Sequence, residues 1–338
     1  MPLAMISGVT GQDGAYLSEI LLAKGYKVIG LKRRSSLINT SRVDHLYDNT
    51  MFHMEYWDSD DPMSLVRYMN EYEPNEFYHL SCQSHVKVSF DIPEHTFNSV
   101  ALSTLRILEA IRNSKRDIKY YQASSSEMFG SAPAPQNELT KFEPQSVYAC
   151  AKVASYYLTR NYRDAHKIFA CNGILFNHES SKRGETFVTR KITMAAAKIK
   201  LGLQDKLYLG NLNAIRDWGH AKDYMNAAYL IMQYDMPEDF VIATNEIHSV
   251  REFCTIAFQC AGINIEWQGS GYNEVGIDKN TNKIIVEVSA KYYRPTEVNI
   301  LQGDYSRAYT LLNWKPIISF EQLIEEMVES DINLYAHN

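Results

Sequence analysis

Residues Leu3–Gly25 read LAMISGVTGQDGAYLSEILLAKG, and their pattern predicts a strand, a glycine-rich turn and a helix. The short apolar run Leu3–Ser7 favours a buried strand, and Ala15–Lys24 has the spacing of a helix that ends at Gly25. Between them lie three glycines that are three residues apart, Gly8, Gly11 and Gly14. Such glycines let the backbone approach a pyrophosphate, which the N-terminus of the following helix attracts. The context predicts a dinucleotide-binding turn, with a purely structural turn as the alternative.

The same alternation of short apolar runs and helical spacing continues through the first half of the chain. Further strands are expected at Lys27–Lys32, Glu76–Ser81, Lys119–Ser124 and Ile168–Leu175. Helices are expected at Pro62–Tyr72, Thr96–Asn113 and Tyr148–Ala165. Strand–helix alternation predicts an α/β fold of the Rossmann type, a doubly wound parallel sheet with helices on both faces.

After about residue 178 the pattern loosens, which predicts a smaller, mixed α/β C-terminal lobe that binds substrate. Polar loops are expected at Asn177–Glu185, Gly210–Gly219 and Gly269–Thr281, and an amphipathic helix over Phe320–Asp331. We expect residues 1–176 to form mainly the dinucleotide-binding domain and residues 177–338 mainly the lobe, with some chain returning to the first domain.

Composition excludes several classes of protein. The 338 residues are 45% apolar and 22% charged, as in globular proteins, and a net charge of -6 argues against a general nucleic-acid binder. The five cysteines are widely spaced without a CxxC pair, so we expect neither disulfides nor a metal site. The absence of a signal peptide or a long apolar run predicts a cytoplasmic protein that does not bind membranes.

The turn after the second strand indicates which dinucleotide binds. An NAD site usually places an acidic residue there to hold the ribose hydroxyls, whereas this chain has Lys32-Arg33-Arg34-Ser35-Ser36. Guanidinium and hydroxyl groups are suited to a ribose 2′-phosphate, so NADP is expected, with Arg33, Arg34 and Ser35 among its ligands. The alternative is a solvated basic turn. The pyrophosphate ligands are expected to be Gly8, Thr10, Gly11, Gln12, Asp13 and Gly14.

Two further segments follow expected strands and could contact the same cofactor. Asp58 follows the third strand of the alternation, which lies between Lys27–Lys32 and Glu76–Ser81, and it could bind the adenine amino group, with Ser59 beside it. The segment after the fourth strand is expected to lie on the nicotinamide side, with Leu80, Gln83 and Ser84 as contacts. Each segment could also be an ordinary loop.

Tyr148 and Lys152 are four residues apart and would share one face of a helix. A cation close to a phenol favours the phenolate and lowers its pKa, so Tyr148 is a candidate base beside a nicotinamide. The alternative is a pair on a helix surface. The fifth strand ends in a run of serines, of which Ser125 could bind a substrate hydroxyl or the tyrosine.

Glu127 is the unusual member of this group. Simple alcohol dehydrogenation needs one base, which Tyr148 supplies, so a second acid–base residue at the sheet edge suggests a second proton transfer. The alternative is a solvated loop carboxylate.

Motifs along nearly the whole chain resemble the GDP-mannose 4,6-dehydratases, a family of extended short-chain dehydrogenases/reductases. The motifs that carry this resemblance are GVTGQDGAYL, LKRRSS, QSHVKVSF, SSSE, YACAK, GILFNHES, FVTRKI, RDWGHAKDY, EDFVIAT and YYRPTE. Dinucleotide binding and YxxxK are common to many related enzymes, whereas NHES, RDWGHAKDY and YYRPTE are the specific motifs.

The resemblance implies a catalytic set of Ser125, Glu127, Tyr148 and Lys152. The family usually has Thr at position 125, so the resemblance predicts a hydroxyl retained but held less rigidly. Ser126 stands where dehydratases acting on dTDP-glucose have Asp, and His95 stands where relatives often have Tyr near the nicotinamide.

The resemblance also implies which residues surround the ligands. His178 and Arg183 would approach the cofactor. The GDP-sugar pocket would be lined by Ser84, Ser125, Asn177, Val188, Lys191, Gly210, Arg216, Arg294 and Glu297. A nucleotide diphosphate needs at least two cations in a chain this acidic, and Lys191, Arg216 and Arg294 would supply them.

The implied reaction converts GDP-D-mannose to GDP-4-dehydro-6-deoxy-D-mannose and water by internal hydride transfer through bound NADP. A minor NADPH-dependent reduction of the keto product to GDP-D-rhamnose is a further expectation. The alternatives are a nucleotide-sugar epimerase or reductase of the same fold, or a non-catalytic NADP-sensing module. In the family, the loop Lys32–Asp44 meets a neighbouring subunit, so a homotetramer built as a dimer of dimers is expected.

Overall fold

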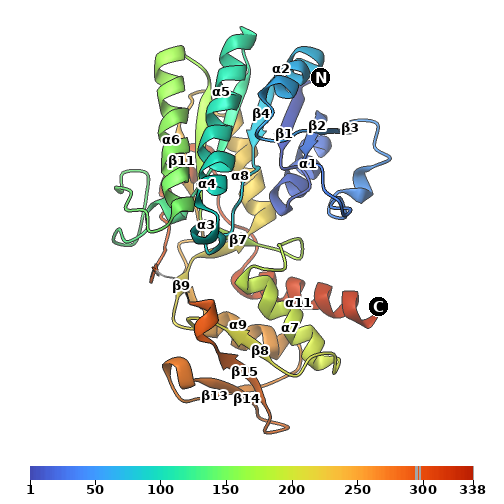
Figure 1. Cartoon of the computed structure of the whole chain (residues 1–338), viewed down its shortest axis with the longest axis vertical. Helices are drawn as coiled ribbons and strands as arrows, with labels where there is room; N and C mark the ends of the chain where they lie inside the picture. Colours follow the sequence, from blue (N-terminus) through green and yellow to red (C-terminus); the bar gives the residue numbers. More distant parts are fainter. Residues whose placement is uncertain (294–295, 297, 338) are drawn as a thin grey trace.

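The centre of the computed structural model, which describes residues 1–293, 296 and 298–337, is a seven-stranded sheet (Figure 1). The strands are β1 (Leu3–Ser7), β2 (Lys27–Lys32), β3 (Phe52–Tyr56), β4 (Glu76–His79), β5 (Lys119–Ser125), β6 (Ala170–Leu175) and β11 (Asp239–Ile242). They lie in the order β3-β2-β1-β4-β5-β6-β11, and every neighbouring pair is parallel. The winding reverses between β1 and β4, which opens a crevice at the carboxyl ends of the strands. The predicted fold class is confirmed.

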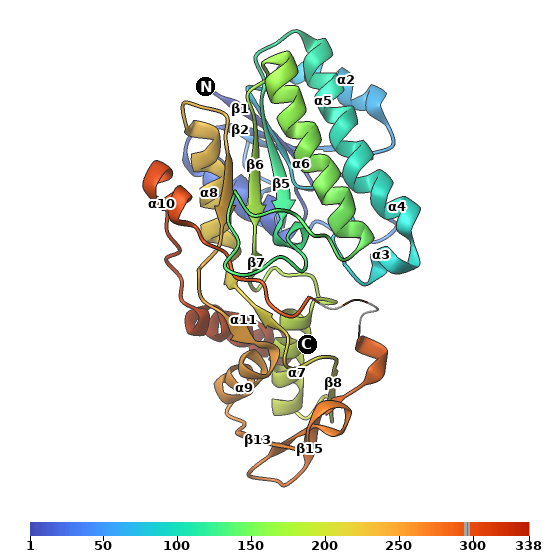
Figure 2. The same ribbon diagram turned by 90° about the vertical axis from the view of Figure 1, so that its left-hand side faces the viewer.

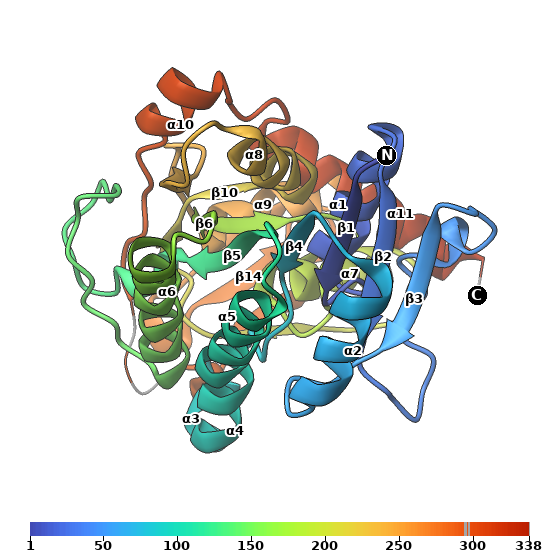
Figure 3. The ribbon, with the colours of Figure 1, turned by 90° about the horizontal axis from the view of Figure 1, so that it is seen from above.

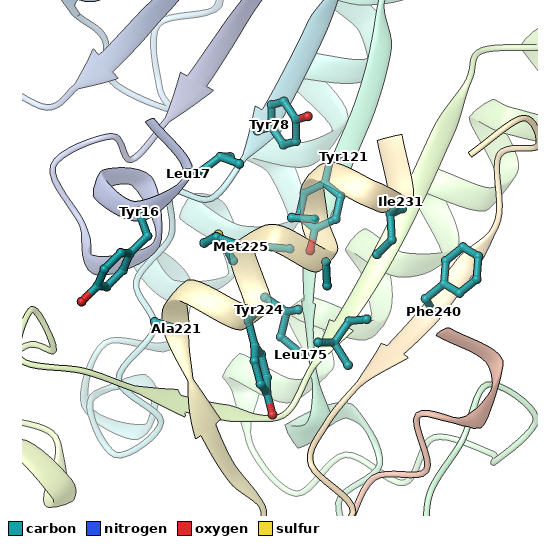
Figure 4. Close-up of a cluster of buried hydrophobic side chains, with 14 of the residues drawn as sticks. Tyr16, Leu17, Tyr78, Tyr121, Leu175, Ala221, Tyr224, Met225, Ile231 and Phe240 are labelled. Atoms are coloured by element: carbon teal, nitrogen blue, oxygen red, sulfur yellow. The ribbon is translucent and has the colours of Figure 1, made fainter. Parts of the chain in front are cut away.

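Helices cover both faces of this sheet, as Figure 3 shows from above. One face packs on α1 (Gln12–Ala23) and α8 (Ala221–Gln233), and the other on α2 (Pro62–Tyr72), α5 (Ser103–Ser114) and α6 (Val147–His166). Side chains alternate along a strand, so Ala4 and Ile6 pack in the core under α1 and α8, whereas Met5 packs under α2 and α5. Figure 4 shows the first of these cores, where Met225 and Ile231 of α8 lie near Tyr121 of the sheet.

The predicted helix over Thr96–Asn113 is interrupted in the structure. The segment consists of α4 (Pro93–Phe97), a π-helical turn over Asn98–Leu102, and then α5. Within the π turn, the Val100 carbonyl accepts hydrogen bonds from the hydroxyls of Thr104 at 3.0 Å and Ser155 at 3.2 Å. These hydroxyls satisfy a carbonyl in the irregular turn, and helical spacing alone does not reveal such contacts.

The C-terminal lobe lies below the sheet domain in Figure 2 and has its own apolar core. Its helices are α7 (Val188–Lys200), α9 (Val250–Cys260) and α11 (Phe320–Ala336), and its strands are β8 (Leu207–Leu209), β13 (Ile265–Gln268), β14 (Val275–Asp278) and β15 (Ile284–Val288). The sheet is mixed, because β13, β14 and β15 pair antiparallel while β15 and β8 pair parallel. The predicted C-terminal helix is confirmed and extends to Ala336.

The three segments predicted as polar loops contain short strands, so that prediction was wrong in part. β7 (Asn177–Glu179) pairs with β10 (Trp218–His220), and β9 (Ile215–Arg216) pairs with β12 (His248–Ser249). β14 lies in the third segment. Strands of two to four residues are defined by a distant partner and leave little periodicity in the local sequence.

Part of the second half of the chain packs with the main sheet. β11 is an edge strand of the main sheet, and α8 and α10 (Ser306–Leu312) pack beside it. We propose that the boundary between the first domain and the lobe lies at residue 176. In this division β11, α8 and α10 are the part of the second half that returns to the first domain. No helix of the described residues is long and apolar enough to cross a membrane.

We predict that Gly30→Ala destabilises the sheet. A Cβ at position 30 would lie 2.6–2.8 Å from the side-chain atoms of Val9, which is fully buried. Overpacking of this kind costs about 1–3 kcal/mol of unfolding free energy, measurable by urea denaturation. The double variant Gly30→Ala/Val9→Ala should lose less than the sum of the two single variants. An unchanged unfolding free energy for Gly30→Ala would contradict this packing.

Candidate active site

A cleft of about 1120 Å³ runs along the carboxyl ends of the parallel strands and is lined by both the sheet domain and the lobe. The predicted residues that line it are Gly8, Thr10, Gly11, Gln12, Asp13, Gly14, Arg33, Asp58, Ser59, Leu80, Gln83, Ser84, Ser125, Glu127, Tyr148, Lys152, Asn177, His178, Arg183, Val188, Lys191, Gly210 and Arg216. His95 lines it as well. Arg34 and Ser35 do not line this cleft, and Arg294 and Glu297 lie outside the described residues.

The glycine-rich turn between β1 and α1 has the shape that a diphosphate requires. Gly8 has a φ of 77°, and a Cβ on Gly14 would lie 2.5 Å from the Gly8 carbonyl oxygen. The helix begins after Gly11, and no side chain caps its first turn. The N-terminal N–H groups and the helix dipole can therefore attract an anion. The turn fits a dinucleotide cofactor.

Asp13 and His178 join this turn to the lobe side of the cleft. The His178 Nε2 atom lies 3.0 Å from Asp13 Oδ2, and its Nδ1 atom lies 2.7 Å from the Phe176 carbonyl oxygen. Burial lowers the pKa of His178, but the Asp13 carboxylate outweighs burial and leaves it raised. Burial raises the pKa of Asp13, yet the charge of His178 leaves it lowered. Both shifts favour an ion pair in which both ring nitrogens donate.

Gln12 forms a second link between the turn and the segment after β6. Its Nε2 donates to the His178 carbonyl at 3.1 Å, and its Oε1 accepts from the Ser180 hydroxyl at 2.7 Å. His178 also stacks on Tyr224 of α8, with ring centroids 4.8 Å apart. These contacts hold the phosphate turn to the segment after β6, in addition to its link to its own strand β1.

Tyr148 and Lys152 lie in the first two turns of α6, as predicted. The Ser146 hydroxyl caps this helix by accepting from the Ala149 N–H at 3.1 Å. The Lys152 ammonium is buried, donates to the Ala123 carbonyl at 2.6 Å and lies 5.8 Å from the centroid of the Tyr148 ring. This hydrogen bond fixes the helix to the end of β5.

The expected lowering of the Tyr148 pKa is not found in the protein alone. Burial raises the pKa of Tyr148 well above its ordinary value, and the neighbouring Cys82 and Glu127 act in the same direction. A hydrogen bond with Ser125 and the charge of Arg183 oppose this rise without overcoming it. The phenol is therefore protonated at rest, because desolvation outweighs the opposing effects of Ser125 and Arg183.

Ser125 and Glu127 occupy the tight turn where β5 ends. The Ser125 hydroxyl accepts a hydrogen bond from the Glu127 backbone N–H at 3.2 Å, which caps a short 3-10 turn over Ser126–Met128. Glu127 is 9% exposed and lines the cleft. The turn places the Ser125 hydroxyl and the Glu127 carboxylate close to the Tyr148 phenol of α6 in the cleft. Such a group can transfer protons at two different positions of a ligand.

Lys191 and Arg216 come from two elements of the lobe. Lys191 lies in the first turn of α7, and its ammonium donates to the Tyr208 carbonyl at 2.5 Å. Arg216 lies in β9 and is buried. The adjacent Asp217 carboxylate accepts from the N–H groups of Thr244 at 2.8 Å and Asn245 at 2.9 Å, which holds the turn carrying Arg216 against the end of β11.

The lining residues that the sequence analysis missed include Arg42, Cys82, His85, Lys87 and Tyr292. Arg42 belongs to the long basic segment after β2, and its Nε donates to the Lys182 carbonyl at 2.6 Å. The feature of the sequence that could have identified Arg42 as a lining residue is its position close to the Arg33-Arg34 pair. Cys82 packs beside Tyr148, and a single cysteine gives no pattern from which that contact could be predicted.

No cluster of three or more His, Cys, Asp or Glu side chains that could hold a metal ion occurs among residues 1–293, 296 and 298–337. The cleft instead combines cationic groups, hydroxyls and a glycine turn.

Solved structures share this fold at low sequence identity. The UDP-glucose 4-epimerase of Thermus thermophilus superposes with a TM-score of 0.81 at 21% identity, covering 97% of this chain and 98% of that one. The dTDP-glucose 4,6-dehydratase of Bacillus anthracis gives 0.81 at 17% identity, covering 100% and 97%. RMD from Pseudomonas aeruginosa gives 0.78 at 19% identity, covering 99% and 100%.

Sequence comparison is more specific than the shared fold. The family model described as GDP-mannose 4,6 dehydratase matches residues 5–327. The GDP-mannose 4,6 dehydratase of Cricetulus griseus is 52% identical, covering 99% of this chain and 93% of that protein. The human protein of the same name is 51% identical with the same coverage, and that of Sinorhizobium fredii is 51% identical, covering 98% and 97%. The chain therefore belongs to the GDP-mannose 4,6-dehydratase family.

Proposed function

We propose that this chain converts GDP-D-mannose to GDP-4-dehydro-6-deoxy-D-mannose and water. The observation that carries the proposal is the convergence of Tyr148, Lys152 and Glu127 in the same cleft that the phosphate turn lines. An epimerase or a simple reductase needs no second base such as Glu127. A cofactor-sensing module would need neither base.

A nicotinamide cofactor fits this cleft, and structures with the same fold are described as complexes with NAD or NADPH. We propose NADP, because Arg33 lines the cleft where an acidic ribose ligand would otherwise lie. The turn from Gly8 to Gly14 would hold the pyrophosphate, and Asp58 with Ser59 the adenosine side. Leu80, Gln83, Ser84, His178 and Arg183 would contact the remainder of the cofactor.

The first half of the reaction is oxidation at carbon 4. Held by the Gly8–Gly14 turn and the neighbouring cleft residues, NADP would supply the hydride acceptor for carbon 4 and the hydride donor for carbon 6. The Tyr148 phenol, with Ser125 as its hydrogen-bonding neighbour, first releases its proton to solvent, and the phenolate then accepts the proton of the carbon 4 hydroxyl. Lys152, fixed by the Ala123 carbonyl, supplies positive charge beside the phenol.

The second half is elimination of water across carbons 5 and 6. The carbon 4 ketone acidifies the hydrogen on carbon 5, and the Glu127 carboxylate accepts that proton. The carbon–oxygen bond at carbon 6 breaks, and the hydroxyl leaves as water with the proton that Glu127 has taken up. Return of the hydride to carbon 6 is then balanced by a proton from solvent at carbon 5. The short turn at Ser125 fixes Glu127 relative to Tyr148, so both bases can address one sugar ring.

The nucleotide end of the substrate would lie against the lobe. Asn177, Val188, Gly210 and Arg216 line that part of the cleft, together with Lys191. Arg294 and Glu297 keep the substrate roles that the resemblance implies. The reductase side activity and a cytoplasmic location also stay predictions.

We propose a homotetramer that uses the segment between β2 and β3. Leu37 is 80% exposed and Ile38 is 90% exposed in this segment, and large apolar side chains this exposed suit a protein partner. Arg34 and Ser35 lie outside the cleft of their own subunit, which leaves them available to the cofactor of a neighbour.

Glu127→Gln and Tyr148→Phe should block different halves of the reaction. Glu127→Gln removes the base at carbon 5 but leaves oxidation at carbon 4, so reduced nicotinamide should accumulate spectroscopically after GDP-mannose is added. Tyr148→Phe should show no such signal, because proton removal at carbon 4 fails. Indistinguishable traces from the two variants would refute this division of roles.

Arg33→Ala should lower the preference for NADP over NAD by about tenfold or more, because a charged hydrogen bond is worth about 1.5–3 kcal/mol. The double variant Arg33→Ala/Arg34→Ala should remove most of the preference. Lys222→Ala, which removes an exposed cation on α8, is the matched control and should change nothing. Equal affinity of the unmodified protein for both cofactors, measured by calorimetry, would overturn the assignment.

Replacing Leu37 and Ile38 together by Asp should break the tetramer and weaken NADP binding. The reason is that carboxylates would replace the two apolar side chains that contact the neighbouring subunit. Light scattering measures the mass and fluorescence the cofactor affinity. A monomeric unmodified protein with full activity would contradict the proposed assembly.

A further inference from the structure

Lysines gather around one aromatic ring on the lobe side of the cleft. The Lys191 ammonium lies 3.4 Å from the centroid of the Tyr292 ring, and the Lys87 ammonium lies 5.8 Å from it. Lys87 also donates to the backbone carbonyl of Lys291. Lys87, Lys191 and Tyr292 all line the cleft.

Within the part of the chain that the structure describes, these ammonium groups have carbonyls and a π face as partners, but no carboxylate. Among the described residues, the lysine ion pairs are those of Lys182 with Glu19 and of Lys206 with Glu287. Burial lowers the pKa of Lys191, Tyr292 acts in the opposite direction, and the charges of Lys291 and Lys87 lower it further. Like charges this close are unfavourable until an anion lies between them.

The two cleft-lining lysines come from opposite sides of the cleft. Lys87 precedes α3 (Val88–Asp91) in the segment after β4, whereas Lys191 lies on α7 and Tyr292 ends a 3-10 turn of the lobe. Gly210 permits this arrangement, because a Cβ there would lie 2.7 Å from the Tyr292 carbonyl oxygen. An anion bound by both lysines would therefore contact both lobes.

We infer that Lys87 is a further substrate-binding residue, which with Lys191 binds the diphosphate of the GDP-sugar across the cleft. The inference rests on the proposed function for the identity of the anion. Tyr292 holds the Lys191 ammonium in place, and its ring and the neighbouring carbonyl keep Lys87 beside it. A diphosphate supplies the negative charge that the cluster lacks, and its binding couples the sheet domain to the lobe.

Calorimetry with GDP, GMP and guanosine tests the inference on the full-length protein. Lys87→Gln keeps a donor for the Lys291 carbonyl but removes the charge. It should weaken GDP binding about ten- to hundredfold and raise the KM for GDP-mannose similarly, with kcat nearly unchanged. Guanosine binding should not change, and Lys87→Arg should restore most of the GDP affinity. Lys200→Gln, which removes an exposed charge at the far end of α7, is the matched control.

Three outcomes would overturn the inference. One is unchanged GDP binding by Lys87→Gln. Another is an equal loss of affinity for GDP and for guanosine, which would mean that Lys87 only holds two segments of the chain together. The third is an equal loss of GDP affinity in Lys200→Gln, which would mean that the effect comes from the net charge of the protein alone. If the unmodified protein bound GDP but did not convert GDP-mannose, the proposed function would fail, and GDP binding would still test Lys87.

Discussion

The carboxyl ends of β1 and β4 meet so closely that position 8 has no room for a side chain. A Cβ on Gly8 would lie 2.9 Å from the backbone of Ser81, and Gly8 already has a φ of 77°. This contact lies where the winding of the sheet reverses, and the cleft opens directly above it. The same edge of the sheet positions three parts of the cleft: the phosphate turn, the segment after β4 and the end of β5.

The proposed catalytic groups at this edge are held by backbone contacts. Lys152 is anchored to the Ala123 carbonyl at the end of β5, and Glu127 is held by the turn that Ser125 caps. Burial keeps the Tyr148 phenol protonated in the protein alone, so it becomes an effective base only when positive charge and a substrate hydroxyl are beside it. This arrangement links proton removal to an occupied cleft.

Much of the fold and of the candidate site could be predicted from the sequence. Leu3–Ser7, Lys27–Lys32 and Pro62–Tyr72 were predicted to the residue, because the two strands are short apolar runs and the helix has helical spacing, each beside turn residues. The π turn over Asn98–Leu102 and the two-residue strand β9 depend on contacts with distant residues, which local periodicity does not contain. Residue types and the family resemblance together named residues of which most line the cleft, whereas the burial that raises the Tyr148 pKa and the approach of Arg42 exist only after folding.

The most direct measurement is incubation of the purified protein with GDP-mannose in deuterated water, followed by mass spectrometry and NMR of the product. The two-base account predicts a product lighter by one water, with solvent deuterium at carbon 5 and the original carbon 4 hydrogen at carbon 6. A product that keeps the composition of the substrate, or one without deuterium at carbon 5, would contradict the role of Glu127 and the proposed dehydration.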